Sequence, residues 1–285
     1  FLIATIISQK IDEGSFSIKQ FYIRRIKRIA PLYLAVMFLL LPLSLFVYYP
    51  AELKDIFQSV SASIVFVSNF FFYREIDYFN PFAQNSPLIH TWSLSIEEQF
   101  YIFLPALLIF TRGKIRSVLI VVLTILSLFY YVFLQKSNPN LAFYSTFSRI
   151  WELLIGVLAG INSKKITKSF LNHSVISIII LICFLVILFT GFIELDIAFL
   201  RIIVVALTIY ILLQRNFLVI KFLSFNPFVH IGLLSYSLYM IHQPVLAIFK
   251  RFFPSTSINL FVIMSFIFLI SYLSYHFFEK PLRYS

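Results

Sequence analysis

The chain has 285 residues, of which 60% are hydrophobic and only 12% are charged. A soluble domain carries about 25% charged residues, so this composition excludes one and indicates a polytopic membrane protein. The net charge of +11 comes from short basic clusters between apolar runs, which argues against nucleic-acid binding, and the single cysteine, Cys183, excludes an internal disulfide.

Apolar runs near the length of a membrane span follow one another along the chain. A partial span covers residues 1–9, and because the chain begins inside it we expect an N-terminally truncated fragment. The predicted fold class is all-α, a polytopic transmembrane helical bundle with about eight full spans. These spans are expected over 29–49, 94–110, 117–134, 147–161, 172–192, 197–213, 230–249 and 258–278.

The basic clusters assign the sides of these spans, because cytoplasmic loops are rich in Lys and Arg. The clusters at 24–28 and 112–116 should both be cytoplasmic, so the ambiguous run 56–73 should dip in and return or lie along the interface. The lysines at 164, 165 and 168 are then inside, and the acidic turn of Glu194 and Asp196 is outside. Lys250–Arg251 is an exception, placed outside. We expect one domain over 1–285 without a soluble C-terminal domain.

The first candidate motif is FYIRRIKRIAP, residues 21–31. One helical face could present the guanidiniums of Arg24, Arg25 and Arg28. Such a cluster suits a polyphosphate, because each guanidinium can form two parallel bonds to phosphate oxygens. The alternative is that basic residues beside a span only mark its cytoplasmic end.

The second motif is HTWSLSIEEQFY, residues 90–101. It places Glu97 and Glu98 in a span, where ionisable groups are costly and usually functional. With His90 they could serve in acid–base chemistry or orient another histidine. Alternatively they form a structural polar network, with Trp92 as an interfacial anchor.

Two further motifs lie in later spans. In FSRIWELLIGVLAG, Arg149 and Glu152 are spaced to pair across one turn, and the glycines at 156 and 160 have the spacing of a close packing face. In GLLSYSLYMIHQPV, the residues Ser235, Tyr239 and His242 form a polar stripe. The histidine is a functional candidate or a hydrogen-bonded core residue.

Prolines and charged residues are expected to interrupt or end the last two spans. Pro244 should break or kink its helix just after His242. In SYHFFEKPLRY, residues 274–284, Glu279 and Arg283 cap the last span and Pro281 should stop it. This final motif is mainly a boundary signal.

Taken in order, FYIRRIKRIAP, HTWSLSIEEQFY, SRIWELLIG, SYSLYMIHQPV and SYHFFEKPLR resemble the membrane acyltransferase 3 family over nearly the whole chain. Members of that family acylate bacterial cell-surface glycans. The resemblance implies a parent fold of ten transmembrane helices, of which this chain lacks the first. That missing helix carries the principal catalytic histidine of the family.

The resemblance implies an integral-membrane O-acyltransferase, which moves an acyl group, commonly acetyl, from cytoplasmic acyl-CoA to a hydroxyl of an envelope polysaccharide or glycolipid. The expected location is the bacterial cytoplasmic membrane, and the partners are the lipid bilayer, acyl-CoA and the glycan acceptor, with no metal and no nucleic acid. Arg24, Arg25 and Arg28 match the CoA-binding motif, and Glu97 and Glu98 match the catalytic acidic pair near the outer face. The substrate-side candidates are His90, Trp92, Arg149, Glu152, Tyr239 and His242.

Two other functions fit the same sequence. A transporter or flippase of a lipid-linked sugar would use polar residues in broken helices, although it predicts inverted repeats, and the sequence shows none. A catalytically inactive truncated homologue is the other alternative.

Overall fold

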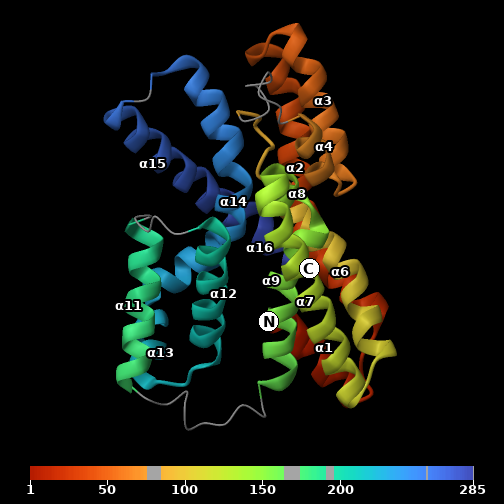
Figure 1. Cartoon of the computed structure of the whole chain (residues 1–285). Coiled ribbons are helices and arrows are strands. Elements are labelled where there is room, and N and C mark those ends of the chain that lie inside the picture. The colour runs from red at the N-terminus through yellow and green to blue at the C-terminus, as the bar shows by residue number, and fades with distance from the viewer. Residues whose placement is uncertain (76–84, 164–173, 191–195, 255, 285) are drawn as a thin grey trace. The chain divides into compact units, whose positions relative to one another are not determined.

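The computed structural model describes residues 1–75, 85–163, 174–190, 196–254 and 256–284. Every regular element in these residues is a helix, which confirms the predicted all-α class (Figure 1). The elements are α1 (Leu2–Asp12), α2 (Ile18–Val47), α3 (Pro50–Ile64), α4 (Ser68–Glu75), α6 (Thr91–Phe110), α7 (Gly113–Ser137), α8 (Pro139–Tyr144), α9 (Thr146–Asn162), α11 (Ser174–Thr190), α12 (Ile197–Leu213), α13 (Phe217–Leu223), α14 (Asn226–Phe252), α15 (Ser257–Ser274), the π-helix η1 (Tyr275–Glu279) and α16 (Lys280–Tyr284).

Five helices in the described residues are long and apolar enough to cross a membrane, so the chain is a multi-pass membrane protein. They are α2, α6, α7, α14 and the continuous run Ser257–Leu282, and α12 with α13 adds a sixth if this pair, bent by 103°, forms one span. The prediction of eight full spans is not confirmed. α9, α11 and α12 have 17 residues each, which is at the short end of the range of about 17–25 residues that can span a bilayer.

The chain forms two compact units, one of residues 1–16 and 100–229 and the other of residues 17–99 and 230–285. In the first unit α9 packs along α7 and also contacts α1, and α11 packs on α12 (Figure 1). In the second unit α2 contacts α3, η1 and α16, and α3 packs on α4. The predicted loop lysines at 164, 165 and 168, as well as Glu194, lie outside the described residues.

The helix α2 begins well before the predicted span. Ser17 caps it, because its hydroxyl accepts a hydrogen bond from the backbone N–H of Gln20 at 3.4 Å. The basic residues of FYIRRIKRIAP are therefore part of the helix, as the expected helical face requires.

The run 56–73 consists of two helices joined by a tight turn. α3 ends at Ile64, α4 begins at Ser68, and Phe66 between them has a φ of 55°, in the left-handed region. The backbone N–H of Val67 donates to the carbonyl of Ala62 at 2.8 Å. A segment that enters the membrane and returns needs such a turn.

The break predicted at Pro244 and the stop predicted at Pro281 are wrong, whereas the alternative of a kink at Pro244 stays a prediction. α14 continues through Pro244 to Phe252, and the last span continues through η1 into α16, which contains Pro281. A proline removes one backbone N–H donor, and in a membrane-spanning helix neighbouring groups can compensate for the bond that is lost.

The glycines of α9 form the close packing face that their spacing predicts. A Cβ built at Gly160 would lie 2.7 Å from the backbone oxygen of Phe1 and 2.9 Å from Thr5 Oγ1. A Cβ at Gly156 would lie 3.1 Å from the backbone nitrogen of Phe1. The first turn of α1 therefore rests directly on the α9 backbone.

Candidate active site

The basic motif lies on the early turns of α2. Arg24 and Arg28 are exposed, whereas Arg25 is half-buried. Phe21 and Ile29 on the same helix are buried, so α2 packs through an apolar face and carries its cations around that face. Of the three arginines, Arg25 is the one that turns toward the interior of its unit.

The two carboxylates lie in the second turn of α6, and they belong to the same unit as the arginines. Glu97 is exposed and Glu98 is half-buried. The charges of Arg25 and Arg28 act on Glu97, and the charge of Arg25 also acts on Glu98. The Oε1 atom of Glu98 is buried and accepts no hydrogen bond within the described part of the chain.

The loop charges predicted that the arginines and the carboxylates lie at opposite faces of the membrane, but the two groups belong to one unit and their charges act on one another. The loop-charge rule assigns a side to a whole loop, but Arg25 and Arg28 are part of the α2 helix and can reach into the bundle. The two groups therefore form one electrostatic cluster, which we call the Arg–Glu cluster and which consists of Arg25, Arg28, Glu97 and Glu98.

Two tyrosines lie near this cluster, the buried Tyr33 and the half-buried Tyr236, and the sequence motifs did not single them out. The hydroxyl of Tyr33 donates to the backbone carbonyl of Ser63 at 2.7 Å, and that of Tyr236 donates to the carbonyl of Ile29 at 2.6 Å. The charge of Glu98 acts on both tyrosines. They connect α2 with α3 and with α14, and so hold the helices on which the cluster is built.

Glu279 is a further functional candidate, which sequence analysis treated as a boundary residue. It is only 4% exposed, and the Ser237 hydroxyl donates to its Oε2 at 2.7 Å. It lies in the π-helix η1, a type of turn that is frequent at functional sites. The signal that could have found it is an acidic residue at the end of a long apolar run.

The histidines of the two separate motifs come together. The ring centroids of His90 and His242 are 5.2 Å apart. His90 is 8% exposed, and neither of its ring nitrogens has a hydrogen-bond partner among the described residues. Nδ1 of His242 lies 2.7 Å from the carbonyl oxygen of Tyr239. Because a carbonyl only accepts, Nδ1 carries the proton and Nε2 of a neutral ring presents a lone pair.

Tyr239 fixes this histidine pair. Its hydroxyl donates to the backbone carbonyl of His90 and can accept from the Ser93 hydroxyl, 2.5 Å away. Trp92, at the start of α6, is half-buried. Ser235 does not join the predicted polar stripe, because it is exposed and donates to the carbonyl of Gly232 in its own helix.

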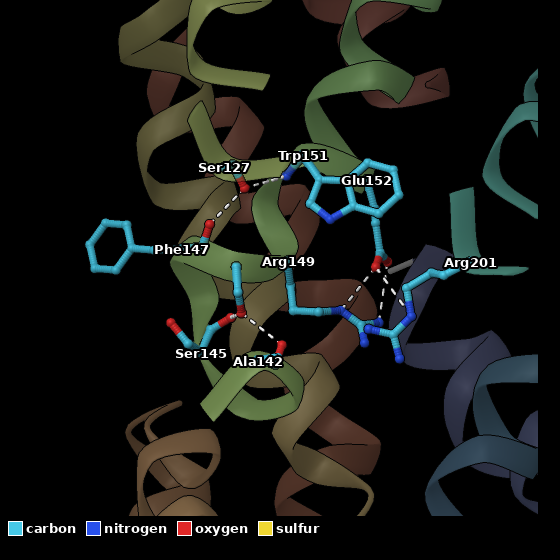
Figure 2. Close-up of polar contacts among 9 residues, drawn as sticks. Ser127, Ala142, Ser145, Phe147, Arg149, Trp151, Glu152 and Arg201 are labelled. Carbon is cyan, nitrogen blue, oxygen red and sulfur yellow. Dashed lines mark hydrogen bonds and ion pairs between the residues drawn. The ribbon is translucent and has the colours of Figure 1, made fainter. Parts of the chain in front are cut away.

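The predicted pairing of Arg149 and Glu152 is confirmed in the other unit. Nε of Arg149 is 3.1 Å from Oε1 of Glu152, and a second guanidinium approaches from α12, with Arg201 Nε 3.9 Å from the same oxygen (Figure 2). Ser127 of α7 accepts from the backbone N–H of Trp151 and donates to the carbonyl of Phe147, and these two bonds join α7 to α9 (Figure 2). The motif spacing predicted the Arg149–Glu152 pair, but the Arg201 contact depends on the packing of α12 on α9.

Metal ligands do not cluster in the described parts of the chain. No three His, Cys, Asp or Glu side chains there are arranged to hold an ion. The chemistry that the described side chains offer is that of carboxylates, imidazoles, guanidiniums and tyrosine hydroxyls.

Comparison with known proteins adds a family to this geometry. Residues 1–276 match the model of a family described as an acyltransferase domain. The chain is 30% identical over 316 residues to the peptidoglycan O-acetyltransferase OatA of Listeria monocytogenes, covering 99% of this chain and 49% of that protein. It is 31% identical over 304 residues to the O-acetyltransferase OatA of Staphylococcus aureus, covering 97% of this chain and 48% of that protein. The chain thus spans about half the length of these relatives, and no solved structure matches it.

Proposed function

Because the chain belongs to the acyltransferase domain family, we propose that it is an integral-membrane O-acetyltransferase. It takes an acetyl group from cytoplasmic acetyl-CoA and delivers it to a hydroxyl of an envelope polysaccharide or glycolipid in the bacterial cytoplasmic membrane. The observation that carries this proposal is the Arg–Glu cluster, in which cations suited to a polyphosphate and carboxylates suited to proton transfer act on one another.

Arg24, Arg25 and Arg28 bind the phosphates of the CoA donor. Guanidiniums form charge-assisted, bidentate bonds to phosphate oxygens. With Lys27 the motif carries four positive charges on α2, more than the two carboxylates of α6 can neutralise. The exposure of Arg24 and Arg28 leaves two of these cations open to a ligand.

Glu97 and Glu98 serve the transfer itself. Glu98 accepts the proton of the acceptor hydroxyl while the hydroxyl oxygen forms a bond to the acetyl carbonyl carbon. The carbon–sulfur bond of the thioester breaks, and the leaving CoA thiolate takes up the proton that Glu98 accepted. Oε1 of Glu98 has no hydrogen-bond partner among the described residues, so it can accept this proton. A positioned carboxylate base contributes about 10²–10⁴-fold to the rate.

The His90–His242 pair lines the acceptor end of the site together with Tyr239 and Trp92. The ring nitrogens of His90 and the Nε2 lone pair of His242 provide hydrogen-bonding groups for sugar hydroxyls. Such groups confer discrimination because they are left unpaired when an acceptor lacks the matching hydroxyl.

The donor assignment is tested with the protein expressed from its complete gene and reconstituted in liposomes. Arg25→Ala combined with Arg28→Ala should raise the KM for acetyl-CoA by about 10-fold or more, as expected when charge-assisted bonds are lost. The control is Arg215→Ala with Lys221→Ala, which removes the same charge from exposed positions at and after the junction of α12 and α13. An unchanged KM in the first variant rejects the proposed CoA-phosphate role.

A second candidate function has one observation in its favour. The bend of 103° between α12 and α13 is a broken helix, and transporters bind substrates at such breaks. A flippase of a lipid-linked sugar would move its substrate across the membrane without consuming acetyl-CoA. Transport measured in liposomes lacking acetyl-CoA would favour it over the transferase.

A further inference from the structure

A polar cavity lies where α1 meets the start of α7 and the end of α9. Its volume is about 440 Å³, and its wall includes Ser8 and Asp12 of α1, Arg112 and Arg116 at the start of α7, and Asn162 of α9. The volume falls in the range of small-molecule sites, about 300–1,000 Å³. All of these residues belong to the unit of residues 1–16 and 100–229.

Arg116 is a buried cation that opens onto this cavity. Its side chain is 8% exposed. Nε donates to the carbonyl of Thr111 at 2.9 Å and Nη1 to the Ser8 hydroxyl at 3.2 Å, and both of these partners are neutral. Within the described chain neither Arg116 nor Arg112 forms an ion pair with Asp12 or any other carboxylate. A buried guanidinium without an anionic partner costs several kcal/mol, so the site favours an anion.

The helix start adds to the same electrostatic imbalance. The N-terminus of a helix carries partial positive charge and favours anions. Arg112 is the N-cap of α7 and forms no side-chain cap bond, and the first turn contains no acidic residue. Three cations, Arg112, Lys114 and Arg116, lie there instead. The helix start and the buried arginine therefore favour the same kind of ligand.

We propose that this cavity binds a phosphate group at the cytoplasmic face. The phosphate comes either from the headgroup of an anionic phospholipid, since basic pockets between membrane helices bind such headgroups, or from a soluble phosphate compound. The site does not involve Arg24, Arg25 or Arg28 and does not depend on the proposed acetyl transfer. Its test measures binding, so its failure would leave the proposed enzyme activity untouched.

The test measures the Tm of the full protein in nanodiscs of phosphatidylcholine, with sodium phosphate titrated at constant ionic strength. The wild type should show a saturable rise in Tm. Arg116→Gln should raise the half-maximal phosphate concentration at least 10-fold, and so should Arg112→Gln, whose side chain is exposed and makes no cap bond to α7. The control Arg215→Gln, at an exposed position in the same unit, should behave as the wild type.

Nanodiscs that contain phosphatidylglycerol separate the two sources. If a lipid headgroup fills the cavity, the Tm of the wild type is already raised and added phosphate has no further effect. If the ligand is soluble, the response to phosphate persists in these nanodiscs. The proposal is overturned if phosphate does not stabilise the wild type in phosphatidylcholine, or stabilises Arg116→Gln and Arg112→Gln equally well.

Discussion

Replacing Gly160 by alanine tests how closely α1 is seated on α9. The new Cβ would lie 2.7 Å from the backbone oxygen of Phe1, and ordinary contacts of this kind begin at 3.4 Å. Because the obstructing atom belongs to the backbone, it cannot rotate away, and α1 must move by several tenths of an ångström. The same change at Gly232 in α14 meets no atom within 4 Å.

The magnitude follows from comparing these two sites. Alanine is favoured over glycine inside a helix by about 0.8–1.0 kcal/mol, and both variants gain this term. Overpacking costs about 1–3 kcal/mol, and only Gly160→Ala incurs it fully. The difference between the two variants is therefore about 1–3 kcal/mol. Gly156→Ala should lie between them, because its Cβ would be 3.1 Å from the backbone nitrogen of Phe1.

Thermal unfolding of the purified variants in detergent, followed by circular dichroism, measures this order. A change of 1 kcal/mol shifts Tm by about 2–4 °C in chains of 150–250 residues, so Gly160→Ala should melt about 2–12 °C below Gly232→Ala. Equal Tm values for these two variants, or a Tm for Gly156→Ala below that for Gly160→Ala, would refute the packing argument.

Three further changes test other parts of the structure. Ser237→Ala removes the donor to Oε2 of the buried Glu279, and should lower the free energy of unfolding by about 1–3 kcal/mol. Glu98→Gln should reduce kcat for acetyl transfer at least 10²-fold. Burial acts to raise the pKa of the Glu52 carboxyl, but its bonds with Arg251 and with a backbone N–H leave that pKa below the ordinary value of 4.5. The stabilisation is thus present above pH 4.5 and lost as the pH falls below it, so the Tm values of the wild type and of Glu52→Gln should differ at pH 7 and converge in acid.

The measurements on Ser237→Ala and Glu98→Gln each have a control in the chain. Ser265→Ala removes an exposed hydroxyl that bonds only within its own helix, and should leave stability unchanged. Glu13→Gln alters an exposed acid at the end of α1, and should retain full transfer activity. If Ser265→Ala destabilises as much as Ser237→Ala, or if Glu13→Gln loses as much activity as Glu98→Gln, the assigned role is wrong.

Much of the helix pattern could be predicted because it depends on local sequence. The predicted span 197–213 is α12, residue for residue, since Asp196 caps the first turn through the N–H of Ala198 and the apolar run ends at Gln214. The Arg149–Glu152 pair was predicted for the same reason, because both partners lie on one turn. The predicted helix ends at Pro244 and Pro281 failed because the proline rule considers only the local sequence. In a membrane-spanning helix, neighbouring groups can compensate for the backbone N–H donor that proline lacks.

The long-range contacts could not be predicted. The ring contact of His90 with His242, and the electrostatic interaction of the α2 arginines with the α6 carboxylates, join residues far apart in the sequence. Counting loop charges predicts on which side of the membrane a loop lies, but it does not predict how far a charged side chain of the adjoining helix reaches into the bundle. Arg251 was an exception to the loop-charge rule, because that rule placed this basic residue outside. The structure gives a reason, since Glu52 binds the Arg251 guanidinium at 2.9 Å and neutralises its charge.

The π-turn at Tyr275–Glu279 sets the phase of the last span. The buried residues there recur every four positions, at Ile263, Ile267, Ser271, Tyr275 and Glu279. In an α-helix of 3.6 residues per turn, each step of four drifts by about 40°, so the fourth step would rotate Glu279 about 160° from Ile263. The wider π-turn accommodates one extra residue in the turn, and this reverses much of the rotation. Deleting a single residue in this turn should therefore rotate Glu279 away from Ser237 without changing any side chain of the pair.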